Sequence, residues 1–97
     1  MAYIPRRVAE HLEQLYAAFA QLQTPEDVAQ LMGDLCTDRE IDEMAQRLSI
    51  AAMLAEGGSY LEIQRVTGVS TTTIARVSRC LVQGSGGYRL VLGEASE

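Results

Sequence analysis

Residues 59–82 read SYLEIQRVTGVSTTTIARVSRCLV, two short amphipathic segments on either side of Gly68. Ser59 and Ser70 precede the segments as N-cap residues, and Glu62 completes a capping box with Ser59.

Two helices can cross steeply over so short a turn only if one residue adopts positive φ and the inward faces interlock. Gly68 meets the first condition. The inward face is expected to consist of Ile63, Val66, Val69, Ile74 and Val77. The stretch therefore predicts a helix-turn-helix.

The outward face of the second predicted helix is polar and basic. At 100° per residue, Thr72 and Arg76 lie on the side away from the inward-facing Ile74. A helix that reads DNA needs residues near its N-terminus that donate to base edges or contact the thymine methyl group. We therefore expect an interface with double-stranded DNA formed by Arg65, Ser70, Thr71, Thr72, Thr73, Ala75, Arg76 and Arg79. Of these, Arg65 and Arg79 are better placed for phosphates.

The upstream sequence predicts three more helices. Residues 5–22 carry an apolar stripe at spacings of three and four, which is expected to face another helix. Thr24 is the expected N-cap of the next helix. A third helix of about 20 residues should follow Thr37, which forms a capping box with Glu40, and should end at Gly57. No segment predicts a strand. The expected fold class is all-α, with five to six helices.

The domain organisation follows from the size of the chain. With 97 residues, 47% of them hydrophobic, residues 1–97 should form one domain. We expect a helical dimerisation core at about residues 5–57, the helix-turn-helix at about 59–82, and a short C-terminal tail at 84–97 whose conformation stays open. A chain this short buries a modest fraction of its surface, so its apolar residues are expected to need a second copy. A homodimer is the expected state.

Charge is distributed unevenly along the chain, which carries a net charge of -5. Residues 1–58 contain four arginines and ten acids, whereas residues 59–89 contain four arginines and one acid. No acid lies between Ala75 and Gly93. Because charges within about 10 Å set the field that attracts a phosphate backbone, a locally basic surface on an acidic chain is compatible with DNA binding.

Other function classes find little support in the sequence. No apolar run of about 18 residues is present and the N-terminus lacks an apolar signal core, so no membrane partner and a cytoplasmic location are expected. Cys36, Cys80 and His11 do not form a metal-binding cluster, so no metal site is expected. The neighbouring acids Asp42 and Glu43 point in different directions on a helix and do not form a general acid/base pair, so no enzyme is expected.

The chain resembles the tryptophan repressor superfamily, and within it the YerC/YecD-type branch. The resemblance runs from about Leu15 to Tyr88, and the matching segments are 35–37, 44–48, 67–70, 73–81 and 84–88. It implies an intertwined, all-helical homodimer whose two heads address successive major grooves about 34 Å apart. It also implies a transcription regulator, with repression as the expected mode. The alternative left open is a helical interaction module in which the helix-turn-helix contacts a protein.

The resemblance also bears on a ligand. In the tryptophan repressor, two arginines sandwich the corepressor tryptophan and a threonine lies nearby; the matching residues are Arg47, Arg76 and Thr37. The sequence departs at Val77, where the tryptophan repressor has glycine, and at Cys80, where it has a serine that helps to hold the ligand. An isopropyl group in a close-packed slot excludes an indole unless the helix moves. These five residues are therefore expected to form a vestigial pocket, with neither tryptophan nor another cofactor.

Overall fold

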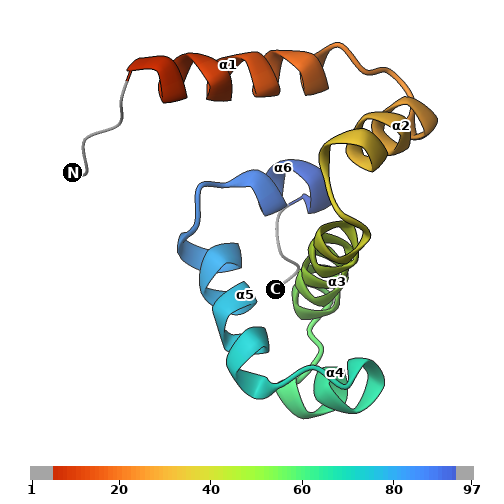
Figure 1. Cartoon of the computed structure of the whole chain (residues 1–97). Helices are drawn as coiled ribbons and strands as arrows, with labels where there is room; N and C mark the ends of the chain where they lie inside the picture. Colours follow the sequence, from red (N-terminus) through yellow and green to blue (C-terminus); the bar gives the residue numbers. More distant parts are fainter. Residues whose placement is uncertain (1–5, 94–97) are drawn as a thin grey trace. The chain divides into compact units, whose positions relative to one another are not determined.

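The computed structural model describes residues 6–93, which contain six α-helices and no strand (Figure 1). The helices are α1 (Arg6–Ala20), α2 (Pro25–Leu35), α3 (Asp38–Ala55), α4 (Tyr60–Thr67), α5 (Thr71–Gln83) and α6 (Gly87–Leu92). None of the helices in this range is long and apolar enough to cross a membrane. The all-α prediction is confirmed. Residue 5 of the expected core and residues 94–97 of the expected tail lie outside the described residues.

Capping boxes begin α3 and α4, as the sequence predicts. The Glu40 backbone N–H donates to Thr37 Oγ1 at 3.1 Å, and the Thr37 N–H donates to Glu40 Oε1 at 2.8 Å. The corresponding bonds between Glu62 and Ser59 measure 3.1 and 3.3 Å. The backbone N–H and side chain of Thr37 lower the pKa of Glu40, and the side chain and backbone N–H of Ser59 lower that of Glu62. Both carboxylates are therefore ionised at neutral pH.

Single hydroxyl groups cap α2 and α5. The Asp27 N–H donates to Thr24 Oγ1 at 3.1 Å, and the Thr73 N–H donates to Ser70 Oγ at 3.3 Å. Each cap satisfies one of the four N–H groups that lack a partner at a helix N-terminus. Four helix starts are thus fixed by hydrogen bonds within three residues of the cap, which is why sequence analysis can locate them.

The chain divides into two compact units that meet within α3, between Ile41 and Asp42. The first unit holds α1 and α2, and none of its described side chains is buried. The apolar stripe expected over residues 5–22 lies mostly on α1, which ends at Ala20. Four large residues of this stripe stay exposed: Val8, Leu12, Leu15 and Tyr16. The expected division into a dimerisation core and a head stays a prediction.

The second unit contains the buried core of the described residues. The core consists of Ile50, Ala51, Ile63, Val69, Ile74 and Val77. The side chain of Val66 was expected to face the core. That expectation is wrong, because Val66 is 70% exposed. It lies about 60° round α4 from Ile63, and Val69 beyond the turn makes the next core contact instead. The fully buried Ile50 was not among the expected core residues.

The glycine-rich segment after α5 leads into α6 (Figure 1). Gly86 adopts the left-handed conformation (φ +92°) and begins α6 without a side-chain cap. Tyr88 and Leu92 of α6 pack against the core, and Arg89 Nη2 donates to the Val82 carbonyl at 3.0 Å. Tertiary contacts thus hold a helix that has no local start signal.

Gly84 and Gly87 provide a matched test of this segment. A Cβ at Gly84 would collide with the Cys80 backbone carbonyl, whereas one at Gly87 would meet nothing within 4 Å. We expect Gly84→Ala to lower the free energy of unfolding by about 1–3 kcal/mol, because the end of α5 must shift. Gly87→Ala should change it by less than about 0.5 kcal/mol. Urea denaturation followed by circular dichroism measures both, and equal values for the two variants would contradict the steric argument.

Candidate functional site

The turn between α4 and α5 has the geometry that the sequence predicts. Gly68 ends α4 with φ +75°, and its N–H donates to the Gln64 carbonyl at 2.8 Å. Thr67 Oγ1 donates to the Ile63 carbonyl at 2.6 Å and accepts from the Val69 N–H at 3.2 Å. Because these bonds join the end of α4 to the turn, they fix the direction in which α5 starts.

The second helix of this motif, α5, has one side buried in the core and the other exposed to solvent. Ile74 and Val77 are buried in the core, at 0% and 2% exposure. On the outward side, Thr72, Arg76 and Arg79 are exposed. No hydrogen bond or ion pair within residues 6–93 engages the guanidinium group of either arginine. The guanidinium groups are therefore available to bind an anion.

The remaining expected DNA contacts lie around the same helix start. Ser70 is exposed and serves as the N-cap, Thr71 is exposed, and Thr73 and Ala75 are half-buried. Arg65 is exposed near the end of α4, the helix that packs against α5. The motif thus carries hydroxyl groups at the start of α5 and guanidinium groups on α4 and further along α5, and such groups donate hydrogen bonds to phosphates and base edges.

An arginine-lined pocket of about 470 Å³ lies beside α5, which contributes Arg76, Val77 and Cys80 to its lining. We call this pocket the α3–α6 pocket; its lining residues are Arg47, Leu48, Arg76, Val77, Cys80, Gly84, Ser85, Gly87, Tyr88 and Val91. Four of the five residues of the expected vestigial pocket are among them. The fifth, Thr37, belongs to the first compact unit, where it caps α3.

Sequence analysis missed one side of this pocket. Tyr88 and Val91 come from α6, whose conformation the sequence left open, and Leu48 of α3 was not among the residues expected at the pocket. The available signal was the apolar run after the glycines, residues 90–92. That run is too short to distinguish a helix from an irregular tail.

The predicted exclusion of tryptophan depends on the side chain of Val77. Its side chain is 2% exposed and belongs to the core, yet the residue also lines the α3–α6 pocket. The pocket therefore retains volume beside Arg47 and Arg76. The expected exclusion of tryptophan depends on the shape of the pocket at Val77, and it stays a prediction.

The comparisons with known proteins agree with this architecture. The model of the Trp repressor protein family matches residues 10–96. The chain belongs to the Trp repressor family. Within residues 6–93, no group of three or more His, Cys, Asp or Glu side chains is placed to hold a metal ion. The α4–α5 motif is the candidate DNA-binding site of this Trp repressor family chain.

One protein similar in sequence and two similar solved structures place this chain among other members of the Trp repressor family. The uncharacterised protein YerC of Bacillus subtilis (strain 168) is 42% identical over 88 residues, which cover 91% of this chain and 85% of YerC. A crystal structure of a candidate Trp repressor from Staphylococcus aureus superposes with a TM-score of 0.79 at 38% identity, covering 86% of this chain and 83% of that chain. A TrpR-like protein from Eubacterium eligens gives a TM-score of 0.80 at 38% identity, covering 91% and 94%.

Proposed function

We propose that the protein is a sequence-specific, DNA-binding transcription regulator that acts as a cytoplasmic homodimer and represses its targets. The observation that carries the proposal is the two-sided helix α5, whose Ile74 and Val77 are buried while Thr72, Arg76 and Arg79 are exposed. Membership of the Trp repressor family supports repression as the mode. The proposal includes no enzymatic activity.

Homodimer formation is supported by the apolar surface of α1. Val8, Leu12, Leu15 and Tyr16 recur at helical spacing and are 37–64% exposed, in a unit without a buried described side chain. Monomeric soluble proteins rarely expose a continuous apolar stripe. A second copy of the chain would cover it.

A mobility-shift assay with genomic fragments tests DNA binding. We expect specific binding whose log affinity falls linearly with log salt concentration, with a slope near -0.9 for each phosphate neutralised. Titrations at about 50 and 200 mM salt suffice to measure that slope. Absence of a specific complex at low salt would overturn the proposal and favour a protein-contacting role for the same motif.

Arg76 and Arg79 are expected to contribute differently to DNA affinity. If Arg76 reads a base edge, Arg76→Ala should cost about 1–3 kcal/mol, or roughly 5- to 150-fold in affinity, and relax the preference at one position. Arg79→Ala should weaken all sequences alike, because a phosphate contact carries no sequence information. A selection from a randomised operator library, run on the parent and both variants, measures the two patterns. Parent-like affinity and preference in both variants would contradict these roles.

We also propose that tryptophan is not the corepressor, because Val77 and Cys80 replace the glycine and serine of the tryptophan repressor. Thermal unfolding should therefore show the same melting temperature with and without millimolar tryptophan, and alanine serves as the control amino acid. Since a ligand that binds only the folded state raises the melting temperature with its concentration, a rise specific to tryptophan would contradict this proposal.

A further inference from the structure

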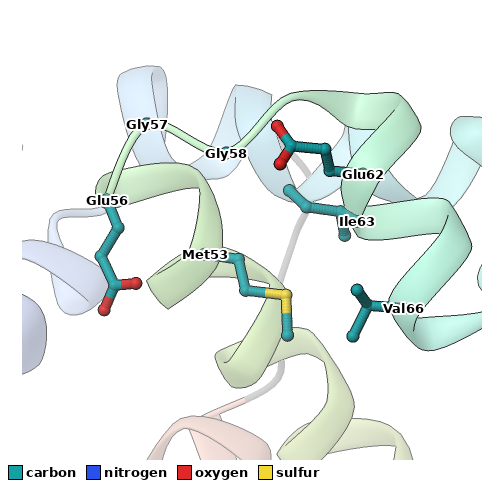
Figure 2. Close-up of a pocket in the computed structure, with 7 residues that line it drawn as sticks. All are labelled: Met53, Glu56, Gly57, Gly58, Glu62, Ile63 and Val66. Atoms are coloured by element: carbon teal, nitrogen blue, oxygen red, sulfur yellow. The ribbon is translucent and has the colours of Figure 1, made fainter.

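The junction of α3 and α4 forms a pocket of about 360 Å³ that the DNA-binding proposal does not use (Figure 2). Its apolar lining comes from Met53, Ile63 and Val66, and two acidic residues, Glu56 and Glu62, complete its side-chain lining. We call it the α3–α4 pocket. No residue of α5 lines it, and it shares no residue with the arginine-lined α3–α6 pocket.

The α3–α4 pocket is open to solvent. Val66 is 70% exposed, and Gly57 and Gly58, in the connection of residues 56–59 between the two helices, place no side chain over the apolar lining (Figure 2). Sites for small molecules typically bury most of the ligand surface. An open groove between two helices instead suits a peptide segment that lies across it and inserts one side chain.

The negative charge of the groove favours a basic residue in that peptide segment. Bonds from Ser59 lower the pKa of Glu62, which therefore carries a negative charge. Glu56 is exposed, and no hydrogen bond or ion pair within residues 6–93 engages its carboxylate. No basic residue lines the groove. Arg65, three residues after Glu62 on α4, interacts electrostatically with Glu62.

We propose that the α3–α4 pocket is a docking site for a peptide segment of a partner protein, with a bulky apolar side chain next to an arginine or lysine. The apolar side chain contacts Met53, Ile63 and Val66, and the flexible thioether of Met53 adapts to its shape. The adjacent cation pairs with Glu56. Because α5 contributes nothing to the groove, docking leaves the outward face of α5 free for DNA.

Selection of random heptapeptides displayed on phage, with the full-length chain as target, tests this proposal. We expect enriched peptides to place an arginine or lysine within two positions of a large apolar residue. A labelled synthetic copy of one such peptide is then titrated with the protein by fluorescence anisotropy. Glu56→Gln should weaken its binding about two- to fivefold, the effect of one exposed ion pair. Val66→Asp should weaken it by about tenfold or more, through loss of apolar contact.

Glu13→Gln is the matched control, because it removes the same charge from an exposed position on α1. It should leave peptide affinity unchanged, and circular dichroism checks that every variant is folded. Failure to enrich any peptide, enrichment of peptides without a basic residue, or unchanged affinity in Glu56→Gln and Val66→Asp would each overturn the proposal. Equal binding by arginine amide alone would overturn it in favour of a small-cation site. Mobility shifts on the same variants report DNA binding separately, so failure of one proposal is distinguishable from failure of the other.

Discussion

Replacing Leu12 by glutamate is expected to separate the proposed dimer into monomers. Leu12 lies in the middle of the exposed stripe of α1, flanked by Val8 and Leu15 at helical spacing. A carboxylate in an apolar interface without a partner costs about 3–5 kcal/mol, which raises the dissociation constant by at least about a hundredfold. Leucine and glutamate have similar helix propensities, so α1 itself should be preserved.

Sedimentation velocity over a range of protein concentrations measures this effect. Gln14→Glu is the control, because it adds the same charge to an exposed position about 200° round α1 from Leu12. We expect it to leave the dimer intact. If both variants dissociate to the same extent, the stripe on α1 is not the interface, and a monomeric parent protein would remove the homodimer from the proposed function.

Truncating Ile74 to alanine should cause a large loss of stability. Ile74 is fully buried and is one of six core residues. Truncation to alanine leaves a cavity, and so small a core has few side chains that can move to fill it. Such truncations cost about 2–5 kcal/mol. The loss is a large share of the stability of an ordinary domain, and it falls on the helix that presents Arg76 and Arg79.

Urea denaturation at one fixed protein concentration compares Ile74→Ala with two controls. Ile74→Val removes a single methyl group and should cost about 0.5–1.5 kcal/mol. Leu61→Ala alters a side chain on α4 that is 76% exposed, and should change the free energy of unfolding by less than about 0.5 kcal/mol. An effect of Ile74→Ala no larger than that of Leu61→Ala would contradict the assignment of Ile74 to the core.

Sequence reasoning located the helices that begin with local signals. Thr24, Thr37, Ser59 and Ser70 each cap a helix through hydrogen bonds to residues three positions away. The turn at Gly68 was predictable for the same reason, because its positive φ is a property of one residue. The exposed positions of Thr72, Arg76 and Arg79 also followed from helical periodicity.

Features that depend on packing were less accessible. Gly86 starts α6 with no side-chain hydrogen bond, and the helix is held by Tyr88, Leu92 and the Arg89–Val82 bond. The walls that α6 contributes to the α3–α6 pocket therefore could not be read from the sequence. Val66 shows the same limit, since periodicity places it near the core and only the packing decides which neighbouring residue is covered.

The short connection through Gly68 also determines how the second unit assembles. Its buried residues all fall within residues 50–77, so bringing them together closes only short loops and costs little chain entropy. Helical proteins dominated by such local contacts fold on the order of microseconds to milliseconds. Association of two chains requires a diffusive encounter and is slower in dilute solution. In the proposed homodimer, we therefore expect each chain to complete its α4–α5 motif before it meets a second chain, so that chain concentration sets the rate of association.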